Sequence, residues 1–221
     1  SDKDFDYLDS NKKEFVKTVL PIIINENQNI LMIRSFVSEL KGKLETFRTL
    51  NNKEIRKLNE IAKKYNIKHH NKHKLDLVDE ILSNVDIIPN SIALAQAAIE
   101  SGWGKSRFAK EYNALFGEYT YDNSKGVIPL ERENGDTHLI KAFSSYSNSV
   151  ESYFDNINSH NAYEDFRDIR NIMRERNNFS NVNLLVNKLS TYAEDENYIK
   201  TIRQVIKTNN FSIFDQKTIT Y

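Results

Sequence analysis

Glycine and proline are scarce in this chain, which has six glycines and three prolines among its 221 residues. Because these two residue types most often end or break helices, their scarcity predicts long uninterrupted helices. Apolar residues at spacings of three and four indicate two such helices near the N-terminus, within 11–40 and 44–65. Their apolar faces favour burial against the rest of the chain; a clamp or a partner surface is the alternative.

Further helical periodicity occurs over 75–84 and in several groups of apolar residues between 147 and 209. No internal repeat and no linker-like stretch interrupts the chain. We therefore predict a mainly α fold with one small β-hairpin lobe. Residues 1–74 are expected to form an N-terminal helical extension that packs on a domain formed by residues 75–221.

One stretch is typical of β-structure. Two β-capable runs, 126–133 and 136–143, flank the dipeptide Asn134-Gly135. Asn-Gly is the strongest short-range hairpin signal, because both residues of the turn must accept positive φ. In a two-residue hairpin of this kind, Glu131 faces His138 across the strands, and Glu133 faces the residue next to the turn.

Charge and composition narrow the classes of function. The 31 basic and 31 acidic residues cancel, so nothing indicates a nucleic-acid partner. No apolar run approaches the roughly 18 residues of a membrane helix. No signal peptide is visible, which is uninformative about targeting because the chain starts at Ser1 rather than at Met.

The potential for metal binding is low. The absence of cysteine excludes disulfides and cysteine-ligated metals. His69 and His73 have the i, i+4 spacing of a zinc-binding pair on a helix, but no third ligand lies at a convincing spacing. We therefore expect a solvated loop over 66–74 and no metal.

The most informative segment runs over residues 89–104. Asn90 or Ser91 can cap the start of a helix there, and four alanines give it high helix propensity and a slim surface. Gly102 is well placed to end it. Glu100 is therefore expected in the last turn.

The last turn is an unfavourable place for a carboxylate. The negative end of the helix dipole disfavours an anion by roughly 0.3–1 kcal/mol, and Ile99 and Trp103 add apolar surroundings. Both effects are expected to raise the pKa of Glu100, as a general acid requires. Gln96, one turn earlier on the same face, could bond Glu100 or a substrate. The alternative is an exposed glutamate at a frayed helix end.

Segment 95–104, Ala-Gln-Ala-Ala-Ile-Glu-Ser-Gly-Trp-Gly, closely resembles the catalytic motif of the peptidoglycan N-acetylglucosaminidases of glycoside hydrolase family 73. More narrowly, the chain is similar to Bax-type members of that superfamily. Asn-Ala-Leu-Phe-Gly over 113–117, the hairpin, and Thr-Tyr-Ala-Glu-Asp over 191–195 are similar to later motifs of the family, and residues 15–33 also look Bax-like. The order of the pieces makes the resemblance specific, although each piece alone is weak.

The resemblance implies a lysozyme-like fold and hydrolysis of the β-1,4 bond after N-acetylglucosamine in peptidoglycan. Glu100 would protonate the leaving oxygen. Glu131 would activate water or stabilise charge at the anomeric carbon, with Glu133 as the next choice. Tyr192 would orient the 2-acetamido group or a water molecule. This chemistry requires neither a metal nor an organic cofactor.

Aromatic and amide side chains are the candidates for binding sugar, with core packing as the alternative for each aromatic residue. These candidates are Gln96, Trp103, Phe116, Tyr119, Tyr121 and Tyr198. Two positions depart from the family pattern: Ala114 stands where a polar residue is common, and Glu194 replaces a threonine. Neither departure affects the proposed acid.

Several alternatives stay open. The reaction could be retaining, inverting or assisted by the substrate's acetamido group, because the choice depends on the separation of the carboxyl groups. A lytic transglycosylase, a muramidase and a non-catalytic glycan-binding module are the competing functions. We expect a monomer, and from the substrate we expect it in the cell envelope, periplasmic or secreted.

Overall fold

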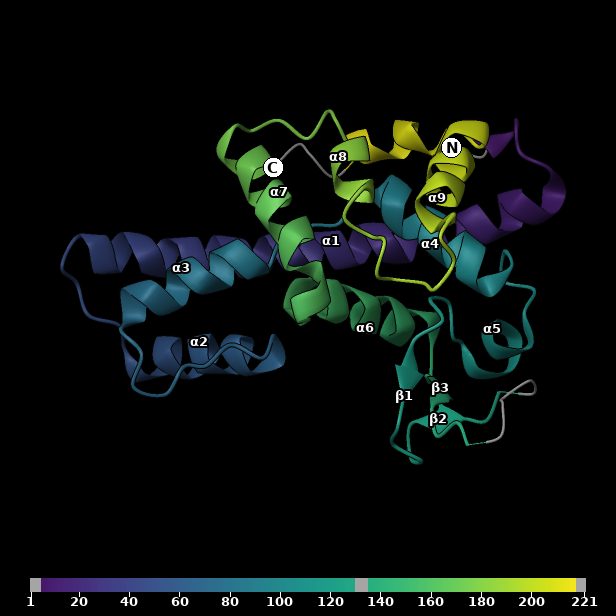
Figure 1. The fold of residues 1–221 in the computed structure, drawn as a ribbon. Coiled ribbons are helices and arrows are strands. Elements are labelled where there is room, and N and C mark those ends of the chain that lie inside the picture. The colour runs from purple at the N-terminus through teal and green to yellow at the C-terminus, as the bar shows by residue number, and fades with distance from the viewer. Residues whose placement is uncertain (1–4, 130–134, 218–221) are drawn as a thin grey trace. The chain divides into compact units, whose positions relative to one another are not determined.

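The computed structural model describes residues 5–129 and 135–217, and its described elements are mostly helical (Figure 1). The prediction of a mainly α chain with a small β lobe is therefore confirmed. The helices are α1 (Ser10–Glu45), α2 (Asn52–Lys64), α3 (Lys74–Asn84), α4 (Asn90–Ser101), α5 (Arg107–Tyr112), α6 (Tyr146–Ser159), α7 (Glu164–Glu175), α8 (Asn183–Val186) and α9 (Tyr198–Thr208). The strands are β1 (Tyr119–Thr120), β2 (Gly126–Val127) and β3 (Leu139–Lys141), and the 3-10 segments are η2 (Asn161–Tyr163) and η3 (Phe211–Lys217).

The contacts of the chain divide it into two compact units. The first contains the N-terminal residues up to Glu26 together with Pro89–Tyr153 and Lys200–Lys217. The second contains Asn27–Ile88 and Phe154–Ile199. The units interleave along the sequence, whereas the predicted division into 1–74 and 75–221 follows chain order and stays a prediction.

The predicted N-terminal helices are present: α1 begins in the first unit and ends in the second at Glu45, and α2 belongs to the second unit. Phe47, whose φ is +59°, lies between α1 and α2. A capping box starts α2: the Asn51 side chain accepts the Glu54 N–H at 2.9 Å, and the Glu54 carboxylate accepts the Asn51 N–H at 3.0 Å. Each bond satisfies a backbone group that the end of a helix leaves unpaired.

A buried aspartate organises the core of the second unit. The Asp86 side chain is fully buried and accepts two hydrogen bonds from Arg174, at 2.9 and 2.6 Å, while Arg34 lies at 3.5 Å. Arg170, also fully buried, donates to the backbone carbonyl of Asp86 at 3.0 Å. Burial opposes ionisation of this carboxyl most strongly, but the Arg174 bonds and the surrounding guanidinium charges together hold the pKa of Asp86 below its ordinary value.

We predict that Asp86→Ala lowers the free energy of unfolding by about 3–5 kcal/mol, because it leaves buried guanidinium groups without their counter-charge. Since the folded-state pKa of Asp86 lies below its unfolded value, its contribution is present above the unfolded pKa of about 3.9 and is lost as the pH falls through the folded pKa. Chemical denaturation at several pH values measures both effects. Asp79→Ala is the control, because Asp79 forms a half-exposed pair with Lys41, worth about 0–1 kcal/mol. Equal losses in the two variants would contradict this account.

In the first unit, α4 is buried on all sides from Asn90 to Ala98. Its start differs from the prediction, because neither Asn90 nor Ser91 caps it. Pro89 precedes the first turn and forms no side-chain cap. Instead the Asp215 carboxylate of η3 accepts the Ser91 backbone N–H at 2.8 Å and the Ser91 hydroxyl at 2.7 Å. A carboxylate at this end also complements the positive end of the helix dipole.

The end of α4 agrees with the sequence prediction. Gly102 has a φ of +56° and ends the helix in the left-handed conformation. The Trp103 N–H donates to the Ala98 carbonyl at 2.8 Å, which satisfies one of the last carbonyls of the helix. Glu100 thus lies in the last turn, as predicted.

The strands form an antiparallel sheet in the order β1-β3-β2, and β1 was missed by the sequence analysis. The register also differs. A two-residue loop at Asn134-Gly135 would place Val127 opposite Ala142, whereas Val127 pairs with Ile140. The pairing of β2 with β3 is therefore shifted by two residues from the predicted one. A shift of two preserves which face each side chain occupies.

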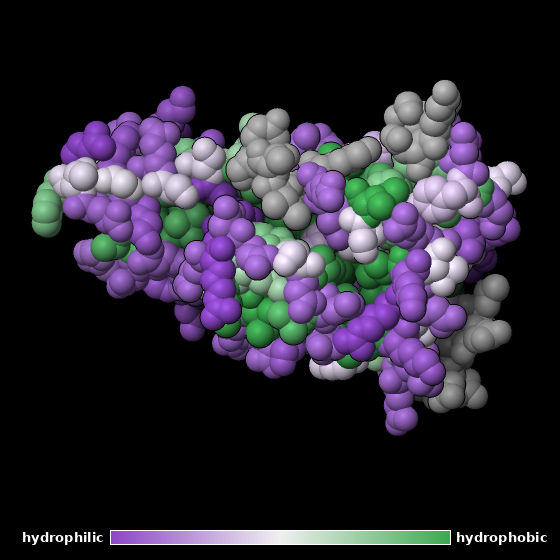
Figure 2. Space-filling view, turned by 90° about the horizontal axis from the view of Figure 1, so that it is seen from above, coloured by the Kyte–Doolittle hydropathy of each residue, from purple (hydrophilic) through white to green (hydrophobic). Residues whose placement is uncertain are grey.

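On the face shown in Figure 2, hydrophobic residues lie between larger areas of hydrophilic ones. Among the described residues, the exposed large apolar side chains come from several parts of the chain; Phe47 and Tyr121 are the most exposed, at 97% and 77%. Within the described ranges, none of the helices combines the length and hydrophobicity needed to cross a membrane.

Candidate functional site

Glu100 lies at the open end of an otherwise buried helix. Its side chain is half-buried, whereas the helix before it is inaccessible to solvent up to Ala98. The backbone of Gly117 packs directly against its carboxyl group: a Cβ at position 117 would lie 2.6 Å from Glu100 Oε2. Gly117 also has a φ of +64°, which favours glycine. The structure therefore brings two separate motifs of the sequence into contact.

The segment before Gly117 is held by α6. The Leu115 N–H donates to Ser149 Oγ at 3.1 Å. The Phe116 ring stacks on Tyr153 with centroids 4.0 Å apart and planes 5° from parallel. The Tyr153 hydroxyl in turn donates to the side-chain oxygen of Gln96 on α4 at 2.5 Å. These contacts link α4 to α6, and α6 to the segment that ends at Gly117.

Gln96 and Phe116, both predicted to bind substrate, belong to this packing. Gln96 is 0% exposed and Phe116 is 1% exposed. In this conformation neither side chain is accessible to a ligand. Their contacts instead connect α4, through α6, to the segment that contains Gly117.

Trp103 follows the turn after α4 and has a positive φ of +58°. Its indole packs edge-on against Phe15, with centroids 5.6 Å apart, and against Phe211 at 6.0 Å. The Lys12 ammonium lies 4.9 Å from the centroid of its ring. Trp103 is therefore packed between the start of α1 and the C-terminal η3 segment.

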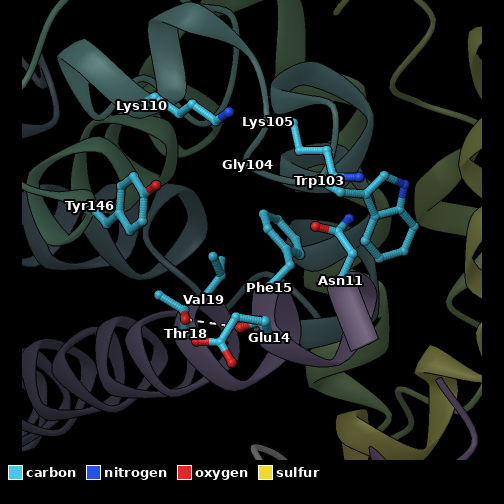
Figure 3. Close-up of a pocket in the computed structure, with 10 residues that line it drawn as sticks. All are labelled: Asn11, Glu14, Phe15, Thr18, Val19, Trp103, Gly104, Lys105, Lys110 and Tyr146. Atoms are coloured by element: carbon cyan, nitrogen blue, oxygen red, sulfur yellow. Dashed lines mark hydrogen bonds between the residues drawn. The ribbon is translucent and has the colours of Figure 1, made fainter. Parts of the chain in front are cut away.

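Trp103 nevertheless borders open space. It lines a cavity of about 360 Å³, into which Lys110 of α5 and Tyr146 of α6 project (Figure 3). It also lines a second cavity of about 270 Å³ beside α9. Clefts that are partly apolar and carry a few polar groups suit small ligands. The proposed contact of Trp103 with sugar stays a prediction.

The remaining aromatic candidates of the first unit lie on and beside the sheet. Tyr119 and Tyr121 are 65% and 77% exposed. The Tyr119 ring meets His138 edge-on, with centroids 4.8 Å apart. Glu131, the predicted partner of His138, and Glu133 lie outside the described residues, so the second carboxylate stays a prediction.

The tyrosine candidates near the C-terminus belong to the second unit. Tyr192 is half-buried and stacks on Tyr198 with centroids 5.8 Å apart and planes 6° from parallel. The Tyr163 ring also packs against Tyr192, with centroids 6.1 Å apart. Tyr198 is 3% exposed. Because Glu100 belongs to the first unit, a joint role with Tyr192 stays a prediction.

The histidine-rich segment forms a loop before α3. His73 precedes the first turn of that helix, and the rings of His69 and His70 lie 4.3 Å apart. His69 and His73 therefore do not share a helix face. Over residues 5–129 and 135–217, no three or more histidine, cysteine, aspartate or glutamate side chains are grouped so that they could hold a metal.

One charged residue near the site was missed. Glu118 directly follows Gly117, and its side chain is only 11% exposed. Burial raises the pKa of its carboxyl group, against the opposing effects of a hydrogen bond from Ser152 and the charge of Lys141. Its only signal in the sequence was its place directly after the Asn-Ala-Leu-Phe-Gly motif.

We predict that Gly117→Ala displaces the Glu100 carboxyl group and lowers the free energy of unfolding by about 1–3 kcal/mol, through backbone strain and the close contact. The measurement is the ¹³C signal of the Glu100 carboxyl, together with denaturation. Gly135→Ala is the matched control, because its φ is +99° but no described atom lies within 4 Å of the added carbon. An unchanged Glu100 signal in Gly117→Ala would contradict the predicted displacement of the Glu100 carboxyl group.

The chain is similar to curated proteins of two kinds. The chain is 32% identical over 184 residues to Protein bax of Escherichia coli strain K12, covering 82% of this chain and 63% of that protein. It is 37% identical over 92 residues to the peptidoglycan hydrolase FlgJ of the same strain, covering 37% of this chain and 29% of that protein. The chain thus spans less than two thirds of the length of these relatives.

Two further comparisons concern the fold and the family. The catalytic domain of the autolysin Auto from Listeria monocytogenes is 20% identical, with a TM-score of 0.45 over 80% of this chain and 96% of that one. The family model of the glucosaminidases, described as mannosyl-glycoprotein endo-beta-N-acetylglucosaminidase, matches residues 75–211. Because this match includes both motifs that meet at Glu100 and covers more than half of the sequence, the chain belongs to the glucosaminidase family.

Proposed function

We propose that this chain hydrolyses the β-1,4 bond after N-acetylglucosamine in the glycan strands of peptidoglycan. The observation that carries the proposal is the placement of Glu100. Its carboxyl group lies half-buried at the end of a buried helix, against the backbone of Gly117. Membership in the glucosaminidase family and similarity to a peptidoglycan hydrolase support the choice of substrate.

In the proposed reaction, Glu100 donates its proton to the leaving glycosidic oxygen while positive charge develops at the anomeric carbon. A second group then stabilises that charge or activates water. Glu131 is the carboxylate proposed for this step, with the substrate's own acetamido group as the alternative. Tyr192 is proposed to orient the acetamido group or the water.

Partner and location follow from this substrate. We propose that the protein acts on peptidoglycan as a monomer in the cell envelope, either periplasmic or secreted. Its equal numbers of basic and acidic residues give no general attraction to nucleic acid. The reaction needs no metal or organic cofactor, because a carboxylic acid supplies the proton.

We predict that Glu100→Gln abolishes cleavage of peptidoglycan while folding and glycan binding stay close to wild type. Glutamine keeps the shape of the side chain but has no proton to donate, and loss of a general acid costs roughly 10²–10⁴-fold in rate. Turnover is measured on isolated sacculi, and binding is measured by co-sedimentation with them. Wild-type turnover in Glu100→Gln would refute the assignment.

The same digests separate the alternatives by mass spectrometry. New reducing N-acetylglucosamine ends support the proposed bond, and new reducing N-acetylmuramic acid ends indicate a muramidase. Products with 1,6-anhydro ends and no new reducing N-acetylglucosamine indicate a lytic transglycosylase. Binding without turnover on several peptidoglycan types indicates a glycan-binding module.

We predict that Glu131→Gln strongly lowers turnover, whereas Glu133→Gln has little effect, because the Glu133 side chain is expected next to the turn and away from the bound glycan. The two variants are matched in charge and chemistry. Kinetics on soluble glycan fragments distinguish them. Equal losses at both positions, or no loss at Glu131, would leave Glu100 acting with Tyr192 and the acetamido group.

A further inference from the structure

Glu118 occupies the junction between the Glu100 contact and the sheet. It directly follows Gly117 and precedes β1. Its backbone carbonyl accepts the Lys141 N–H at 2.8 Å, which extends the β1–β3 pairing by one bond toward Gly117. Gly117, which packs against Glu100, is therefore bonded directly to the first residue whose backbone pairs with β3.

The Glu118 side chain ties this junction to two other elements. Its Oε2 accepts the Ser152 hydroxyl of α6 at 2.6 Å. Ser152 Oγ in turn accepts the Lys141 ammonium of β3 at 2.7 Å, and that ammonium lies 3.8 Å from Glu118 Oε2. Glu118 Oε2 thus links the start of β1 to the end of β3 and to the middle of α6.

This arrangement is costly for the fold alone. The other oxygen, Glu118 Oε1, is buried and has no hydrogen-bond partner among the described residues. A buried acceptor without a partner has lost its hydrogen bonds to water without replacement, which lowers the stability of the fold, and more so where the group carries charge. An apolar side chain of similar size would fill such a place without that cost. A carboxyl group kept there is better explained by what its bonds hold in position.

The Gly117 backbone lies so close to Glu100 that a small displacement of it would move the Glu100 carboxyl group. A Cβ at Gly117 would lie only 2.6 Å from the carboxyl of Glu100, so the two groups have little free space between them. Leu115 and Phe116 are already tied to α6, and Glu118 provides the tie on the other side of Gly117. A displacement of about 1 Å at a reacting group is enough to cost roughly 10²-fold in rate.

We propose that Glu118 is a positioning residue for Glu100: together with Ser152 and Lys141, it fixes the backbone of Gly117 against the carboxyl of the proposed acid. It touches neither substrate nor water in this role and acts only through the Gly117 backbone. The proposal rests on the glycosidase function proposed above for Glu100. It adds a component that lies behind the site rather than in it.

The first test is a set of variants assayed on soluble glycan fragments. Glu118→Leu is expected to lower kcat by about 10–100-fold with KM within about twofold of wild type, because binding is kept while the acid is misplaced. Glu118→Gln keeps the acceptor for Ser152 and is expected to recover most of that loss. A loss confined to KM, or a Gln variant as impaired as the Leu variant, would overturn the proposal.

Ser152→Ala keeps the test valid if the Leu variant folds poorly. It is expected to lower kcat about fivefold, and its effect should disappear in the Glu118→Leu background, because both changes break the same link. Full additivity of the two effects would contradict the proposal. Glu111→Leu is the control: this exposed carboxylate on α5 pairs only with Arg107 among the described residues, and wild-type kinetics are expected. A kcat loss in Glu111→Leu equal to that in Glu118→Leu would also count against the proposal.

A second readout separates this proposal from the proposed function. The ¹³C signal of the Glu100 carboxyl, assigned with Glu100→Gln, is expected to shift in Glu118→Leu and to return toward wild type in Glu118→Gln. An unchanged signal in Glu118→Leu would overturn the positioning role whatever the substrate is. If the wild-type protein cleaves no glycan but the signal shifts, the proposed function fails and the link from Glu118 to Glu100 stands.

Discussion

The close approach of the Gly117 backbone to the Glu100 carboxyl is the contact on which the rest of the first unit depends. A Cβ at Gly117 would lie 2.6 Å from Glu100 Oε2, so any other residue at that position would displace the carboxyl group. It also requires both partners to be held firmly. The hydrogen bond between Tyr153 and Gln96 links α6 to α4, and the stacking of Phe116 on Tyr153 links the same helix to the Gly117 segment. Buried groups thus control the place of a half-exposed one.

The helix that carries Glu100 is fixed at both of its ends by different chemistry. At its start, Asp215 accepts two hydrogen bonds from Ser91; burial raises the pKa of this carboxyl, while both bonds favour its ionised form. At its end, Gly102 allows the left-handed turn that closes the last hydrogen bonds. An anion at the start of a helix is stabilised by the helix dipole, whereas an anion at the end is disfavoured. Asp215 and Glu100 therefore experience opposite ends of the same dipole.

Local chemistry made part of this arrangement predictable. The apolar spacing predicted the principal helices, and the alanines together with Gly102 placed Glu100 in the last turn of α4. The cap from Asp215 could not be predicted, because Asp215 and Ser91 are 124 residues apart in the sequence. The first residues of the helix, Asn90 and Ser91, also looked able to cap it themselves. The strand β1 was missed for a similar reason: it is recognised by its pairing with β3, and Asn134-Gly135 carries no information about a third strand. Long-range pairing decided each feature that periodicity and turn chemistry left open.

The environments of Glu100 and Glu118 explain why two nearby carboxyl groups suit different roles. As the proposed general acid, Glu100 has to reach a substrate, so its half-buried side chain takes its position from neighbours rather than from complete burial. Glu118 is almost fully buried and bonded to Ser152, so it can hold its neighbours but cannot reach a glycan from that position. An exposed residue at 118 would give the Gly117 backbone no such anchor, and a buried residue at 100 would give the reaction no acid. The burial of the two carboxyl groups thus fits the division proposed here between a reachable acid and an anchored neighbour, and Gly117 is the residue that contacts the first and is bonded to the second.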